Sequence, residues 1–143
     1  MFLGDLTMSQ KISFMILAEK VMTSDNVKGR KEKAMIDSFF KEMNLSKKMV
    51  ETYEQSYDET LELLSKYPKS ANVKMYIELV ALAFVDNKFV DEEVRTIDEI
   101  RSSMGLSSGG LTPDIDEEEI FRLIQEYTKI ATALQKIIKK VED

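Results

Sequence analysis

Two segments of this chain, residues 12–22 and 75–85, have helical periodicity and carry apolar residues on nearly every side. Such a helix is stable only when neighbouring elements cover it, so two of them belong at the centre of a domain. Glycine and proline are scarce, at five and two residues, and no segment has the alternation typical of a strand. The sequence therefore predicts an all-α domain built around two central helices.

An amphipathic helix is expected after each central helix. The first begins near residue 31, and the second follows the acidic turn at 86–87. The positions on their buried stripes match in pairs: Glu32 and Glu93, Ile36 and Ile97, Met43 and Met104. Asn44 and Gly105 come next and are expected to end the two helices, because both residue types tolerate left-handed backbone geometry.

This matching extends to an internal repeat at an offset of 61 residues. Nine positions between 16 and 46 are identical in the second copy without a gap, whereas ordinary residue frequencies give about two. The identical positions are Ile16, Asp25, Asn26, Glu32, Ile36, Asp37, Met43, Leu45 and Ser46. The sequence therefore predicts two copies of a helix–acidic turn–helix hairpin, at residues 12–46 and 73–107.

Two shorter helices are expected between the copies. Ser46 and Ser56 are candidates for their first caps, and Ser56 with Glu59 has the spacing of a capping box. Tyr67-Pro68 ends the second of them. With the hairpins and a C-terminal helix, this predicts about seven helices in one domain spanning residues 1–143.

The last predicted helix covers about residues 113–141, starting near Thr112-Pro113 or Asp116. Its apolar stripe consists of Ile120, Leu123, Ile124, Tyr127, Ile130, Ala131, Leu134, Ile137, Ile138 and Val141. The stripe is expected to clasp the two hairpins. The same spacing suits a seam with a partner, which is the alternative, so the chain is expected to be a monomer or a weak dimer.

Composition excludes several classes of function. The chain has neither cysteine nor histidine, so thiol nucleophiles, zinc–thiolate sites and imidazole bases are absent. Any metal site must use oxygen ligands, which suit Mg²⁺, Ca²⁺ or Mn²⁺. A formal charge of −6 disfavours nucleic acid. No apolar stretch is long enough to span a membrane, and no signal peptide is evident, so a cytoplasmic location is expected.

The acidic turns are the candidate site. Asp86 ends a central helix, and Glu93 lies in the first turn of the next helix, on its core-facing stripe. Asp25 and Glu32 repeat this arrangement. Two carboxylates directed toward one corner repel each other unless a cation, a proton or several donors intervene, so a hard divalent ion is one solution. The alternative is purely structural, with Asp-Asn as turn chemistry and Glu accepting helix N–H groups.

Four other acids are assigned to the surface. Glu19 and Glu78 interrupt the apolar central helices and are expected to lie on their solvated edges. Asp37 and Asp98 lie beside the core stripe and are expected to pair with neighbouring lysines.

The two copies resemble the TerB-like family, named for tellurite-resistance proteins. The closest stretch is LVALAFVDNKFVDEEVRTIDEIRSSMGLS, and the weaker copy is LAEKVMTSDNVKGRKEKAMIDSFFKEMNLS. The resemblance implies a compact helical domain with a pseudo-repeat and a role in bacterial stress response. It also implies that Asp86, Glu93, Asp25 and Glu32 are the family acids, which are suspected metal ligands. Asn26 and Asn87 stand where the family usually has glycine.

No nucleophile–base pair is recognisable, so no catalytic residue is assigned and a non-enzymatic role is predicted. The chain is expected to bind a divalent cation, or an unidentified protein partner, through the acidic corner. Two alternatives stay open. One is an interaction module without metal, using the last helix or a methionine-rich groove. The other is a hydrolase in which carboxylates hold a catalytic metal.

Overall fold

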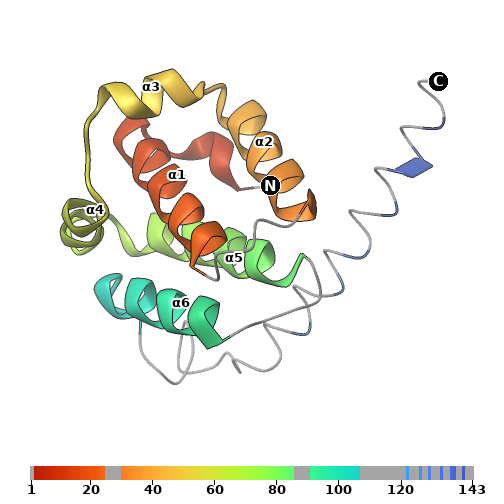
Figure 1. The fold of residues 1–143 in the computed structure, drawn as a ribbon. Coiled ribbons are helices and arrows are strands. Elements are labelled where there is room, and N and C mark those ends of the chain that lie inside the picture. Colours follow the sequence, from red (N-terminus) through yellow and green to blue (C-terminus); the bar gives the residue numbers. More distant parts are fainter. Residues whose placement is uncertain are drawn as a thin grey trace.

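The computed structural model describes residues 2–24, 30–85 and 91–106, together with seven single positions between 122 and 140. Over these residues the chain is helical and contains no strand. The elements are η1 (Leu3–Asp5), α1 (Met8–Thr23), α2 (Arg30–Met43), α3 (Lys47–Thr52), α4 (Tyr57–Leu64), α5 (Lys69–Phe84) and α6 (Asp91–Ser103). The described part thus confirms the all-α class, with six α-helices (Figure 1).

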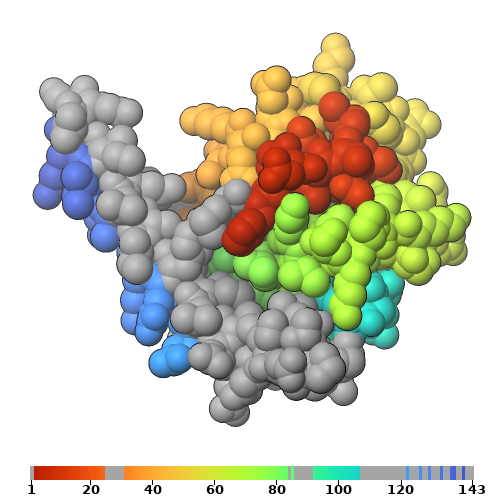
Figure 2. Space-filling model, turned by 180° about the vertical axis from the view of Figure 1, so that it is seen from behind, coloured from red at the N-terminus to blue at the C-terminus, as the bar shows by residue number. Residues whose placement is uncertain are grey.

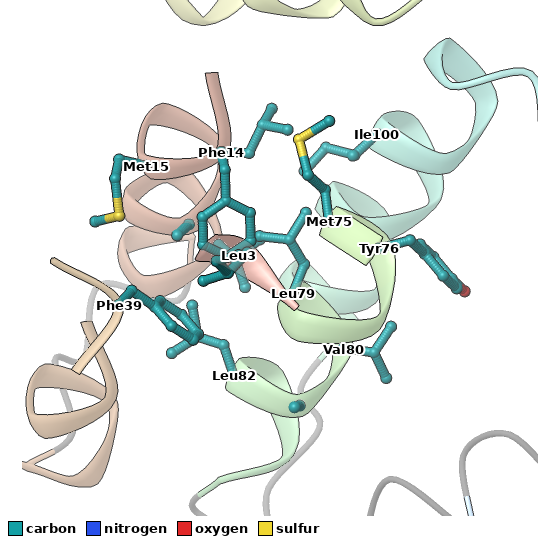
Figure 3. Close-up of a cluster of buried hydrophobic side chains, with 14 of the residues drawn as sticks. Leu3, Phe14, Met15, Phe39, Met75, Tyr76, Leu79, Val80, Leu82 and Ile100 are labelled. Atoms are coloured by element: carbon teal, nitrogen blue, oxygen red, sulfur yellow. The ribbon is translucent and has the colours of Figure 1, made fainter. Parts of the chain in front are cut away.

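The two apolar segments form α1 and α5, which pack against each other at the centre of the domain. Helices α2, α4 and α6 pack around this pair (Figure 1). The core contains fully buried side chains from both central helices, among them Phe14, Leu17, Met75 and Leu79. Figure 3 shows Phe14, Met75 and Leu79 gathered between the helices, with Phe39 of α2 and Ile100 of α6 at the edges of the cluster. The prediction of two buried central helices is confirmed.

The helix boundaries follow local capping chemistry. The hydroxyls of Ser46 and Ser56 accept hydrogen bonds from N–H groups three residues later and begin α3 and α4, as predicted. A complete reciprocal capping box occurs instead at Thr7 and Gln10, where α1 begins, and the sequence reading missed it. Each such cap satisfies N–H groups that the first helical turn leaves without an intrahelical partner.

The bounds and caps of the helices correspond at the predicted offset of 61 residues. Helices α1 and α5 each have 16 residues, and their first residues are 61 positions apart, as are those of α2 and α6. Asn44 and Gly105 follow α2 and α6 with positive φ angles of 55° and 75°. After each, the next N–H group bonds five residues back, from Leu45 to Phe40 and from Leu106 to Arg101. Both helices therefore end in a left-handed cap, as predicted.

Several predictions lie outside the described residues. They are the turns at 25–29 and 86–90, which include Asp25 and Asp86, and most of the C-terminal segment with Thr112 and Pro113. The seven described positions of that segment are helical and exposed: Arg122, Glu126, Lys129, Ala133, Lys136, Ile137 and Lys140. Ile137 was assigned to the buried stripe, yet its side chain is 58% exposed. Among the described helices, none has the length and hydropathy needed to cross a bilayer.

Candidate functional site

Glu32 and Glu93 lie in the first turns of α2 and α6, and both side chains are buried, at 4% and 2% exposure. The adjacent acid in α6, Glu92, is exposed. One turn further along, Ile36 and Ile97 are also buried, at 6% and 3%. The prediction that both glutamates point along the core-facing stripe is confirmed.

Burial of these two carboxylates has a free-energy cost. Moving an ionised carboxylate from water into the protein interior costs on the order of several kcal/mol. The charged form persists there only where hydrogen-bond donors or a positive charge compensate that cost. The N-terminal turn of a helix provides part of this compensation through its N–H groups and its dipole. The same buried glutamate occurs at the matched position of α2 and α6, so the first turn of each helix has to meet this cost.

The oxygen donors of this site suit a hard cation. The chain contains no histidine or cysteine, so only carboxylates, carbonyls and hydroxyls can act as ligands. Glu32 and Glu93 both provide carboxylate oxygens, and both side chains are buried. Within the described ranges no group of three or more acidic side chains is placed to hold a metal. Asp25 and Asp86, the other two predicted ligands, lie outside those ranges, so their approach to the glutamates stays a prediction.

Glu78 is buried, contrary to the prediction from the sequence. Glu78 was expected on a solvated edge of α5, but its side chain is only 2% exposed. Its Oε1 accepts a hydrogen bond from the backbone N–H of Phe2, with an N–O distance of 3.3 Å. The backbone of the N-terminal segment therefore reaches that side of α5, which the helical pattern of α5 could not indicate.

The other surface acids fit their predicted places more closely. Glu19 is partly exposed, and both Asp37 and Asp98 are exposed on their helices. Asp98 pairs with Arg101, one turn later, at 3.0 Å. The partner is an arginine rather than the expected lysine. An exposed pair of this kind contributes little to stability, typically below about 1 kcal/mol.

A hydrogen bond between α4 and α6 was not predicted from the sequence. The Tyr57 hydroxyl donates a hydrogen bond to Oε1 of Glu99 at 2.7 Å. The ammonium group of Lys20, on α1, lies 5.0 Å from the centre of the Tyr57 ring. Tyr57 thus connects three helices, including α6, which carries Glu93. Partial burial, the bond to Glu99 and the charges of Glu99 and Asp58 raise the pKa of Tyr57 well above its ordinary value.

Replacing Tyr57 by Phe should lower the free energy of unfolding at pH 7 by about 0.5–1.5 kcal/mol, because the hydroxyl bond is lost. The raised pKa means that folding favours the protonated phenol. Its contribution is complete below the unfolded pKa of about 10 and is lost as pH rises from there through the folded pKa. Urea unfolding at neutral and alkaline pH measures both effects.

The Tyr57→Phe chain should therefore lose less stability than the wild type between about pH 10 and 11. Tyr53→Phe is the matched control, since Tyr53 is 50% exposed. If stability fell with rising pH equally in Tyr57→Phe and in the wild type, neither burial nor the bond to Glu99 would raise the Tyr57 pKa in solution.

Comparisons with known proteins identify no relative. No protein-family model, no curated protein and no solved structure matches this chain. Function can therefore be inferred only from the residues themselves and from their placement in this fold.

Proposed function

We propose that this chain is a non-enzymatic, TerB-like helical domain that binds a divalent cation at its acidic corner. The matched burial of Glu32 and Glu93 supports this proposal most directly. Two equivalent carboxylates withdrawn from water, each beside an Asp-Asn turn, form the kind of oxygen-rich set that Mg²⁺, Ca²⁺ or Mn²⁺ binds. By the resemblance, the biological setting is a bacterial stress response of the tellurite-resistance type.

The proposal includes a pseudo-twofold relation between the hairpins. The equal lengths of α1 and α5 and the matched caps after α2 and α6 support it. In such an arrangement Asp25 and Glu32 would form one half of the site, and Asp86 and Glu93 the other. The first turn carries Lys28 and Arg30, whereas the second has Phe89 and Asp91, so the second half should be the stronger ligand.

Thermal unfolding with and without millimolar Mg²⁺, Ca²⁺ and Mn²⁺ tests the cation site. An ion present at a hundred times its Kd should stabilise the fold by about 2.7 kcal/mol. For a domain of this size that corresponds to an increase in Tm of roughly 5–10 °C. Above the Kd, the Tm should continue to rise approximately with the logarithm of the ion concentration, as binding to a single site requires.

Substitution of Asp86 and of Glu93, the predicted ligands of the stronger half, tests whether these residues bind the cation. Asp86→Asn and Glu93→Gln should each abolish the ion-dependent increase in Tm. Without ions, Asp86→Asn should be as stable as the wild type or more so, because one of two repelling charges is removed. Glu92→Gln is the control, since Glu92 is the exposed neighbour on the same turn. If no ion shifts the wild-type Tm and Asp86→Asn is destabilising, Asp86 and Glu93 are turn and cap residues.

An interaction module without metal is the second candidate, and the surface of α3 favours it. Val50 of this short helix is buried, whereas Met49 is 39% exposed and Tyr53, the C-cap residue one turn later, is 50% exposed. Exposed aromatic and methionine side chains are common at protein interfaces. Loss of partner capture in Tyr53→Ala, with ion binding unchanged, would separate this function from the cation site.

A further inference from the structure

Helix α4 belongs to a segment, residues 55–67, whose two ends meet at one serine of α1. Nε2 of Gln55 donates a hydrogen bond to Oγ of Ser13 at 3.0 Å, and the hydroxyl oxygen of Tyr67 lies 2.8 Å from the same atom. The Ser13 side chain is completely buried. Glu54, which precedes the segment, has a left-handed φ angle of 49° and separates it from α3. This α4 segment is therefore a loop that is closed on α1 through a single hydroxyl group.

A chain of directed hydrogen bonds runs through this contact. Nε2 of Gln55 also donates to Oγ1 of Thr60 at 2.8 Å, which uses both hydrogens of the amide. The Tyr67 hydroxyl donates to the carbonyl oxygen of Ser9 at 3.3 Å. The hydrogen of Ser13 therefore remains for the bond to the Tyr67 oxygen, so Ser13 both accepts and donates. Without the Ser13 hydroxyl, an N–H of Gln55 and the oxygen of Tyr67 would each lose a partner.

Apolar burial holds the α4 segment less firmly than it holds the central helices. The buried residues of α4 are Thr60 and Leu64, and only the second is apolar. Helix α1, by contrast, buries several large apolar side chains, including Phe14, Met15 and Leu17. In Figure 2 the yellow-green part of the chain, to which α4 belongs, forms part of the outer surface. A helix of eight residues is not stable in water by itself, so α4 depends on these attachments.

We propose that the α4 segment opens and recloses as one cooperative unit while the central helices stay folded, and that the Ser13 hydroxyl holds it closed. Because both ends bond to the same group, loss of that group frees both ends together. Segments with few buried apolar contacts open at a lower free energy than the core. Opening also breaks the bond between Tyr57 and Glu99, exposes Leu64 and makes the side of α1 that carries Ser13 accessible. This conformational device does not depend on the proposed cation site, whose predicted ligands lie outside the segment.

Native-state hydrogen exchange of the full-length chain, followed by NMR, tests the cooperative unit. The amides from Thr60 to Tyr67 should share one opening free energy, and they should exchange at least about tenfold faster than the slowest amides of α1 and α5. Low concentrations of denaturant should change their rates little, because this opening exposes little surface. The proposal is overturned if these amides exchange only through global unfolding, with the same free energy and denaturant dependence as the amides of α1 and α5.

Substitutions identify the contact that holds the segment closed. Ser13→Ala should speed the exchange of the α4 amides by about fivefold or more, because a hydrogen bond at each end of the segment is lost. Tyr67→Phe, which removes the other hydroxyl of one of these bonds, should speed the same amides. Phe39→Leu, at a buried position of α2, is the control and should speed only the amides that exchange through global unfolding. Unchanged α4 rates in both hydroxyl variants, or equal acceleration of α4 and core amides in Phe39→Leu, would overturn the proposal.

Discussion

Phe14→Ala should lower the free energy of unfolding by about 3–5 kcal/mol, the usual cost of removing a fully buried aromatic ring. Phe14 is completely buried on α1. Its ring meets that of Phe39, on α2, edge to face, with centroids 5.0 Å apart. The loss combines lost apolar burial with the cavity that remains between the central helix and α2. Urea unfolding followed by circular dichroism gives the value directly.

A double-mutant cycle with Phe39→Leu isolates the ring pair. Edge-to-face pairs contribute about 0.5–1.5 kcal/mol beyond their area burial, so the cycle should give a coupling energy of that size. Met8→Ala, at a side chain that is 42% exposed, is the control and should change stability by less than about 0.5 kcal/mol. A Phe14→Ala loss no larger than that of Met8→Ala would contradict the packing of α1 at the centre.

The central helices could be predicted from periodicity, because a helix that is buried on all sides carries apolar residues on all sides. The segment that forms α5, with buried Met75, Leu79 and Leu82, lacks the continuous polar face that an amphipathic surface helix exposes to water. Caps were predicted for a similar reason. Ser46 and Ser56 act through N–H groups only three residues away, so their effect is readable from local spacing.

Contacts between distant segments were the ones that the sequence did not reveal. Glu78 has the sequence neighbourhood of a surface acid, yet it is buried and accepts a hydrogen bond from the N–H of Phe2, 76 residues away in the chain. Tyr57 and Glu99 meet at a separation of 42 residues. A local pattern describes which face of a helix is apolar. It does not specify which segment covers a polar position, since that depends on how the helices are arranged in space.

The candidate site lies between these two cases. The burial of Glu32 and Glu93 was predictable, because their stripe also contains Ile36 and Ile97, all four of them now found buried. Their convergence with Asp25 and Asp86 depends on the conformation of the two turns and on the angle between the hairpins. Neither property follows from periodicity, so the four-carboxylate corner is a prediction for the cation titration to test.

Leu3→Ala should lower the free energy of unfolding by about 2–5 kcal/mol, the range for a buried leucine truncated to alanine. Leu3 is completely buried although it belongs to a helix of only three residues. Its contribution should therefore match that of a residue on a central helix. Chemical unfolding of the full chain measures the loss. Asp5→Ala is the control, since Asp5 is an exposed residue of the same short helix.

The hydrogen bond to Glu42 tests whether residues 2–6 are held firmly against the helices. If Glu42 holds the segment as its 2.6 Å bond to the Leu3 N–H indicates, Glu42→Ala should lower stability by about 1 kcal/mol. The losses in unfolding free energy of Glu42→Ala and Leu3→Ala should then be non-additive. If one substitution already releases the segment, the second removes few remaining contacts. Fully additive losses, or a Leu3→Ala chain as stable as the wild type, would show that residues 2–6 are not held against α2 and α5 in solution.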